Sequence, residues 1–138
     1  GWSPYFTSPG DSLTITGRGD VGKAVYRSDP YVPIVRLIAL VPKGDDSAQF
    51  YADYINARVN FPLESTGVPQ LTAPQVRSIE VFRPPALEQR AIATVLHDAD
   101  AEISALQARL RKARDMKQGM MQELLGGRIH LVPEGVHV

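Results

Sequence analysis

The chain has 138 residues, a hydrophobic fraction of 43% and a formal net charge of zero, from 15 basic and 15 acidic side chains. This hydrophobic fraction supports a folded core and argues against wholesale disorder. The chain contains no cysteine, which excludes disulfides, thiolate catalysis and cysteine-ligated zinc. The balanced charge differs from the basic surplus of a stand-alone nucleic-acid-binding domain, although a partner subunit can supply part of the phosphate contacts.

Two further sequence features indicate where the protein is located. The longest apolar stretch, residues 32–42, contains Arg36 and is too short to span a bilayer. The first residues lack the basic start and the apolar run of a signal peptide. We therefore expect a cytoplasmic protein that does not contact a membrane.

Residues 1–85 are rich in Gly, Pro and β-branched residues, and they predict a small mixed α/β domain. A short helix is expected from Ser47 to about Arg58, and a single helical turn begins after Thr72. Pro33 confines the beginning of one expected strand to a sheet edge. The four expected strands lie at residues 12–16, 23–27, 31–41 and 78–82.

A glycine-rich loop joins the first two expected strands. Its residues 17–24 nearly match the nucleotide-binding loop GxxxxGK[ST], but Ala24 replaces the hydroxyl that would bind magnesium. That loop must also open a helix, whereas the residues after Lys23 favour a strand. A hairpin loop is therefore favoured over an ATP-binding loop.

Three basic side chains lie on or beside this loop: Arg18, Lys23 and Arg27. Such side chains on a rigid hairpin can reach phosphates or base edges in a groove of DNA. A solvated turn would carry the same residues, and the sequence leaves both interpretations open. Arg36, within an apolar strand, is likewise either a ligand contact or a paired structural arginine.

A long helix is predicted from Pro85 to Leu125, where Gly126 and Gly127 supply a stop. It would be about 60 Å long at 1.5 Å per residue. Apolar residues follow one another along this helix in steps of four and three residues. These steps average 3.5 residues, which is the spacing of a coiled-coil seam. This seam needs a second helix. Its positions are Ile92, Leu96, Ala99, Ile103, Leu106, Leu110, Ala113, Lys117, Met120 and Leu124.

Charge is unevenly placed along this helix. Residues 88–102 contain four acids and one base, whereas residues 103–118 contain five bases and one acid. Two such helices would repel each other if parallel and attract each other if antiparallel, which favours an antiparallel pair. The alternative is that the charges only complement the helix dipole.

No catalytic constellation is found. Asp98 and Asp100 are two residues apart, so they face different sides of a helix and cannot easily share a proton or a metal. His97, His130 and His137 are too scattered to form a local metal motif. We therefore expect no enzyme activity, no catalytic residue, no metal and no cofactor.

The residues resemble one known family, the specificity subunits of type I restriction–modification systems. The family's recognition domain ends in a "PP..EQ..IA..L..D" pattern, which Pro84-Pro85 and Glu88-Gln89 begin here, and it continues into a long helix. Residues 116–128 are similar to the family's "K.GLMQ.LL.G..R" ending, and the loop around Gly17 resembles its glycine loop. Residues 66–71 also match.

The resemblance implies a subunit that reads DNA through two target-recognition domains, held apart by an antiparallel pair of long helices. These helices dock methyltransferase subunits that use S-adenosylmethionine, and a separate motor subunit drives cleavage with ATP. This chain departs from that pattern, because it has one recognition domain, short at its N-terminal end, and one helix. It would be a C-terminal fragment or a half-sized subunit, and as a homodimer it would rebuild the two-domain arrangement.

The sequence thus predicts an α+β fold, a small mixed α/β target-recognition domain (residues 1–85) followed by one long coiled-coil helix (86–126) and a short extended tail (127–138). The expected function is a non-catalytic DNA-specificity subunit whose partners are double-stranded DNA and a methyltransferase subunit, with a homodimer formed through the long helix. The alternative is a protein-interaction or assembly module that does not read DNA. The residues expected to contact DNA are Arg18, Lys23, Arg27 and Gln70, with glutamine suited to adenine. The residues expected to pair the helices are Ile92, Leu96, Ile103, Leu106, Leu110, Met120 and Leu124.

Overall fold

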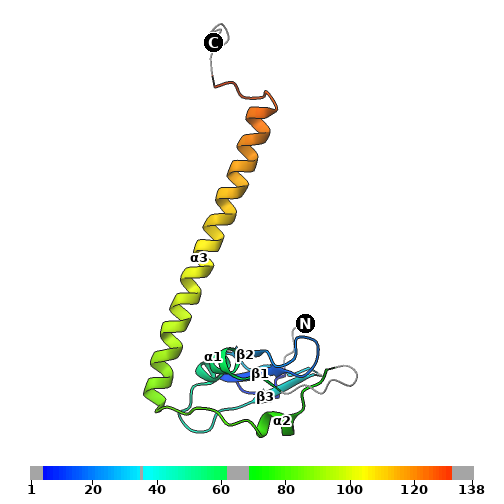
Figure 1. Ribbon diagram of the computed structural model, residues 1–138, viewed down its shortest axis with the longest axis vertical. Coiled ribbons are helices and arrows are strands. Elements are labelled where there is room, and N and C mark those ends of the chain that lie inside the picture. The colour runs from blue at the N-terminus through cyan, green and yellow to red at the C-terminus, as the bar shows by residue number, and fades with distance from the viewer. Residues whose placement is uncertain (1–4, 35, 62–68, 132–138) are drawn as a thin grey trace. The chain divides into compact units, whose positions relative to one another are not determined.

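The computed structural model describes residues 5–34, 36–61 and 69–131. The chain divides into two compact units, Gly1–Leu96 and His97–Val138. Three strands and three helices follow in the order labelled in Figure 1. They are β1 (Ser12–Thr16), β2 (Ala24–Arg27), β3 (Leu37–Leu40), α1 (Ala48–Arg58), α2 (Ala73–Arg77) and α3 (Ala86–Leu125). The predicted α+β fold class is therefore confirmed.

The three strands form one antiparallel sheet in the order β2-β1-β3. β1 lies in the centre, where Ile15 faces Ala24 of β2 and Ile38 of β3. Because side chains alternate along a strand, Leu13 and Ile15 lie on one face of the sheet, and Ser12 and Thr14 lie on the other. The two expected strands around the glycine-rich turn are thus confirmed as a hairpin.

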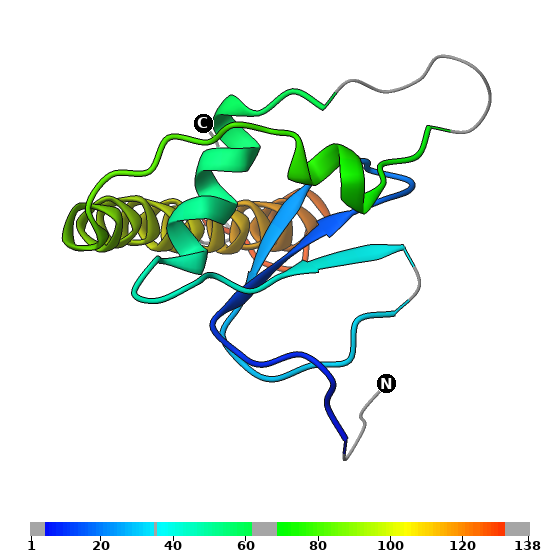
Figure 2. The same cartoon turned by 90° about the horizontal axis from the view of Figure 1, so that it is seen from below.

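Helix α1 packs against the sheet on the face of Leu13 and Ile15 (Figure 2). The helix begins after Ser47, whose side-chain oxygen accepts the N–H of Phe50, so the predicted cap is confirmed. The buried core is small. It consists of Leu13, Ile15, Ala24, Ala48, Ala52, Ile55 and Leu71.

The strand expected at residues 31–41 is much shorter in the structure. Only Leu37–Leu40 forms β3, while Tyr31 makes an isolated bridge with Ser8. Arg36 has a φ of 90°, in the left-handed region, which interrupts extended pairing directly before Leu37. Residue 35 lies outside the described part of the chain.

The prediction of a strand at residues 78–82 is wrong. This segment runs without strand pairing, and its amides find other partners: the N–H of Ile79 binds the carbonyl of Val76, and the N–H of Phe82 binds the hydroxyl of Tyr54. The single turn after Thr72 is confirmed as α2, in which Gln75 accepts the backbone N–H of Thr72.

Helix α3 begins and ends where the sequence predicts, within one residue at its start. After it, the N–H groups of Gly126, Gly127 and Arg128 bind carbonyls of the last turn, and Gly127 has a φ of 68°. This is the expected left-handed glycine stop. The expected extended tail is described only to residue 131, because residues 132–138 lie outside the described part. No helix among the described residues combines the length and hydropathy needed to cross a bilayer.

Candidate nucleic-acid interface

The loop between β1 and β2 is held together by its own backbone. The N–H of Gly22 binds the carbonyl of Thr16 at 2.8 Å, and the N–H of Val21 binds the carbonyl of Gly19 at 2.9 Å. Gly19 and Gly22 have φ values of 81° and 87°, which side-chain-bearing residues rarely adopt. A strand follows this loop, so it lacks the helix N-terminus that a nucleotide-binding loop needs.

Gly17 joins three segments of the chain at the start of this loop. Its N–H binds the carbonyl of Arg36 at 2.7 Å, and its own carbonyl accepts the N–H of Leu71 at 2.9 Å. A Cβ at position 17 would lie 3.0 Å from the carbonyl oxygen of Leu71 and 3.1 Å from that of Arg36, so glycine allows the close approach. The neighbours of Gly17 and Leu71 along the chain, Arg18 and Gln70, are therefore brought side by side.

The side chains of Arg18 and Gln70 form a direct pair. Both the Nε and the Nη2 of Arg18 donate to the Oε1 of Gln70, at 3.1 Å and 2.6 Å. The two residues are 52 positions apart in sequence, and both are exposed. Thus the structure brings together two of the four residues that the sequence predicts as DNA contacts.

Arg36 joins this pair around one open hollow of about 410 Å³. Its side chain is exposed, and no ion pair of its guanidinium occurs among the residues that the structure describes. The hollow is lined by Gly17, Arg18, Arg36, Leu37, Ile38, Gln70, Leu71, Thr72 and Ala73. We call Arg18, Gln70 and Arg36 the donor cluster.

Lys23 and Arg27, the other two predicted DNA contacts, do not line this hollow. Lys23 is exposed, and its Nζ lies 4.0 Å from a carboxylate oxygen of Asp20. Arg27 is half-buried against the sheet, where its Nε donates to Thr14 Oγ1 at 3.2 Å and its guanidinium lies 5.9 Å from the centre of the Tyr31 ring. Arg27 therefore has structural partners that the sequence did not indicate.

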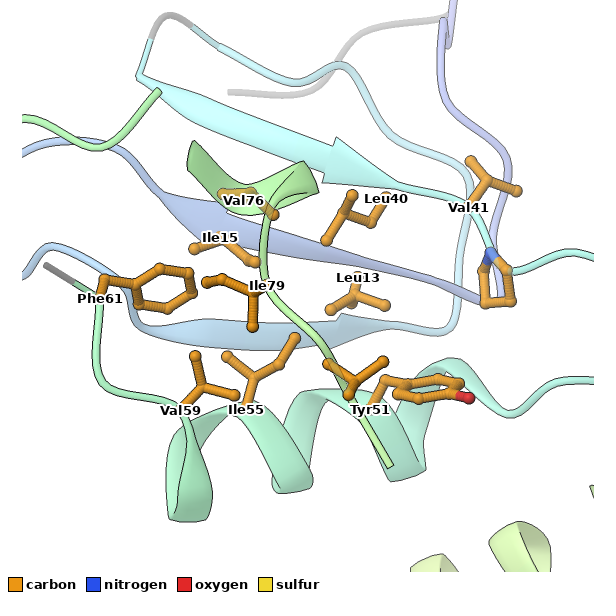
Figure 3. Close-up of a pocket in the computed structure, with 12 residues that line it drawn as sticks. Leu13, Ile15, Leu40, Val41, Tyr51, Ile55, Val59, Phe61, Val76 and Ile79 are labelled. Atoms are coloured by element: carbon orange, nitrogen blue, oxygen red, sulfur yellow. The ribbon is translucent and has the colours of Figure 1, made fainter. Parts of the chain in front are cut away.

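A second hollow, of about 220 Å³, opens between the sheet, α1 and the segment that follows α2. Figure 3 shows apolar side chains from these elements turned toward one another, among them Leu13, Ile55 and Ile79. Tyr51 contributes the only polar side-chain group of the lining, so this hollow does not suit DNA, whose surface is charged and polar.

The first turns of α3 are anchored to the start of α1 by Gln89, a fully buried polar side chain. Its Oε1 accepts the backbone N–H of Ser47 at 2.8 Å, and its Nε2 donates to Asp46 Oδ1 and to the carbonyl of Pro84, both at 2.9 Å. Arg83 completes the junction with a salt bridge of 2.9 Å to Asp46. Every hydrogen-bonding group of the buried amide is thus used.

The contacts at this junction shift the pKa values of Asp46 and Arg83. The hydrogen bond from Gln89, followed by that from Arg83, lowers the pKa of Asp46 below its ordinary value. The bond to Asp46 raises the pKa of Arg83. Both groups therefore stay charged around neutral pH. In β2, burial and then a hydrogen bond to Asp11 raise the pKa of Tyr26.

The predicted helix-pairing residues lie along α3 with much of their surface open to solvent in the single chain. Leu106 is 52% exposed, and the other large apolar members from Leu96 to Leu124 are between 37% and 56% exposed. Ile92 is half-buried. Apolar side chains of this size are usually covered when they follow one another along a helix face.

Comparison with known proteins identifies the family. The type I restriction modification DNA specificity domain matches residues 4–113. The chain belongs to this family. Similar proteins of Mycoplasma pneumoniae named as type I specificity subunits include one that is 32% identical over 70% of this chain, which is 26% of its own length. Another is 30% identical over 69% of this chain, or 28% of its own length. The C-terminal part of a third is 30% identical over 69% of this chain and 65% of its length. This chain thus spans about a quarter of the first two relatives.

The family assignment confirms the predicted resemblance, although residues 66–68 of the quoted motif lie outside the described residues. Two structural features escaped the sequence reasoning: the placement of Arg36 beside Arg18 and the burial of Gln89. For Gln89 a signal existed, because it precedes Ala93 by four residues and both lie on the buried side of α3. The sequence singled out Arg36 as a possible ligand contact, but no local signal predicted its placement beside Arg18, because Gly17, Arg18 and Gln70 come from distant segments.

Proposed function

We propose that this chain is a non-catalytic DNA sequence-specificity subunit of a type I restriction–modification system. Its first unit would read a half-site of double-stranded DNA, and methylation and cleavage would reside in partner subunits. The observation that carries this proposal is the family match over residues 4–113, which covers both the loop with Arg18 and the first part of α3.

The donor cluster supports DNA reading by this unit. It places two arginines and a glutamine around one open hollow, and these are residue types that contact phosphates and base edges. Lys23, exposed on the same loop, fits a phosphate contact. Arg27 would contact DNA only if it left its partners Thr14 and Tyr31.

We also propose that α3 pairs with α3 of a second copy in antiparallel orientation, about a two-fold axis midway between Ile103 and Leu106. Residues equally distant from this midpoint then face each other, so Ile103 meets Leu106 of the partner. By the same rule Leu96 meets Ala113 and Ala99 meets Leu110, so seam positions meet seam positions.

The charges agree with the same register. About this midpoint, Asp98 lies level with Arg111 of the partner helix, and Asp100 lies level with Arg109. An antiparallel pair therefore places acids beside bases on both flanks of the seam. The helix dipole is a weaker explanation, because it acts only near the ends, and the last turn of α3 carries no basic residue.

Cysteine crosslinking tests this register, since the native chain has no cysteine. We expect a mixture of Leu96→Cys and Ala113→Cys chains to form a disulfide-linked dimer, while Leu96→Cys alone forms none. A parallel pair would instead crosslink Leu96→Cys alone. Leu106→Asp should convert the dimer to a monomer, and a dimer that persists in light scattering would refute the seam.

Binding of duplex DNA by the complex with its methyltransferase subunit tests the specificity role. We expect binding that weakens steeply as salt rises, because phosphate contacts release counterions. The exposed seam of α3 also favours the alternative, an assembly module. If the methyltransferase complex assembles through this chain but shows no salt-sensitive, sequence-dependent DNA binding, the assembly module is the correct function.

A further inference from the structure

The hydrogen bonds within the donor cluster decide which of its side-chain groups remain free as donors or acceptors. The free groups in turn decide which base the cluster can read. Base reading by this cluster rests on the proposed DNA-specificity function. Arg18 donates two hydrogen bonds to Gln70 Oε1, at 3.1 Å and 2.6 Å.

The orientation of the Gln70 amide follows from this contact. Arginine has five N–H donors and no acceptor, so only the carbonyl oxygen of Gln70 can face it. The Nε2 group, which carries two donors, must therefore point away from Arg18. No partner of this Nε2 occurs among the residues that the structure describes.

The pair is held in place by its neighbours. Arg18 follows Gly17 and Gln70 precedes Leu71, and the backbones of Gly17 and Leu71 are bonded at 2.9 Å. The Leu71 side chain is only 3% exposed and belongs to the core. The contact between Arg18 and Gln70 is thus built on two anchored backbone segments, and it need not be assembled when DNA binds.

Arg36 lines the same hollow, and its backbone shows strain. Its φ of 90° is unfavourable for a residue with a Cβ, and its carbonyl is held by the N–H of Gly17 at 2.7 Å. Such a conformation persists where the surrounding structure imposes it, and it is found at functional sites. The polar side-chain groups that Arg18, Gln70 and Arg36 leave unpaired are all hydrogen-bond donors.

Base edges differ in how many acceptors they offer. In the major groove, guanine presents two adjacent acceptors, N7 and O6, whereas adenine presents an acceptor beside a donor. A free glutamine matches adenine because it offers both an acceptor and a donor. In Gln70 the acceptor is already occupied by Arg18, so the adenine pattern is no longer matched.

We propose that Arg18 and Gln70 act as one specificity-determining unit that reads guanine in the major groove. Arg18 occupies the glutamine carbonyl and leaves a donor-only surface. The sequence-based expectation that Gln70 suits adenine applies only to a glutamine without this partner.

The test is the methylated sequence motif in DNA from a host that expresses the chain with its methyltransferase subunit. The native chain should require guanine at the base pair that the unit reads. In Arg18→Ala the glutamine carbonyl is free, so methylation of sites with adenine at that position should rise by about tenfold relative to guanine. Gln70→Glu keeps the contact with Arg18 but replaces the free donors by an acceptor, so methylation of guanine sites should fall.

Arg58→Ala serves as a charge-matched control, because Arg58 is exposed at the end of α1 and does not line the hollow. It should leave the motif unchanged. If Arg18→Ala and Gln70→Glu reduce methylation equally at all sites without altering the motif, the pair binds phosphate and the proposal is overturned. If the native complex methylates no defined motif, the proposed function fails, and the guanine assignment fails with it. Unchanged near-ultraviolet circular dichroism of each variant verifies that it is folded.

Discussion

Replacing Gln89 by alanine should destabilise the first unit strongly, because its fully buried amide makes three hydrogen bonds. A buried hydrogen bond contributes about 1 kcal/mol net, and a partner left unsatisfied costs about 1–3 kcal/mol. The substitution also leaves a cavity. We therefore expect the free energy of unfolding to fall by about 3–4 kcal/mol, a large part of the roughly 5–15 kcal/mol of a typical domain.

The positions of the aromatic residues allow the loss of stability in the first unit to be measured selectively. Every aromatic residue lies between Trp2 and Phe82, so the near-ultraviolet circular dichroism signal reports the first unit and not the later turns of α3. Urea unfolding followed by this signal should show a midpoint that is lower by about 2 M in Gln89→Ala, for a denaturant slope of about 1.5–2 kcal/mol per M.

Two further variants determine whether the hydrogen bonds are responsible. Gln107→Ala makes the same chemical change at an exposed site of α3, and we expect no change in the urea midpoint. Gln89→Glu keeps the acceptor for the Ser47 N–H but loses both donors and places a carboxylate beside Asp46. It should be destabilised at pH 7 and recover partly at lower pH, where a carboxyl is protonated. Equal midpoints for Gln89→Ala and Gln107→Ala would refute the reasoning.

Two other predictions concern acid stability and the helix. The pKa of Asp46 is lowered below 3.8 in the folded state, so the stability that its charge contributes is present above pH 3.8 and is lost as the pH falls through the folded pKa. The difference in urea midpoint between the native chain and Asp46→Asn should therefore shrink below pH 3.8; a difference that stays constant down to pH 2 would contradict this. At Gly119 an added Cβ meets nothing within 4 Å in the single chain, so Gly119→Ala should stabilise α3 by about 1 kcal/mol in the monomeric Leu106→Asp background, measured by thermal melting. In the native background we expect the same change to leave dimerisation intact, measured by sedimentation, because Gly119 is not a seam position; a weakened dimer would contradict the proposed seam.

The sequence predicted best the elements whose signals are local. Ser47 caps α1, and the glycines after Leu125 end α3, as expected from neighbouring residues alone. The hairpin of β1 and β2 was also predicted, since its turn residues lie between two β-branched runs.

The sequence failed where pairing depends on distant partners. Residues 78–82 have strand-like composition, but a strand requires a neighbour with free backbone groups, and this segment has none in the described structure. Similarly, residues 31–36 were expected to pair along their whole length. In the structure, the strained backbone of Arg36 and its bond to Gly17 divert the chain before Leu37.

The donor cluster shows why the residue types of a site are not enough to predict its chemistry. The sequence selected Arg18 and Gln70 as DNA contacts, and it assigned adenine to the isolated glutamine side chain. The structure joins them across 52 residues, so that one acceptor is consumed and only donors remain. Because base reading depends on the groups left free after internal hydrogen bonding, an arginine that contacts a glutamine changes the base that the glutamine can read. A change of Arg18 alone should therefore alter the base preference of Gln70 even if Arg18 itself never touches that base.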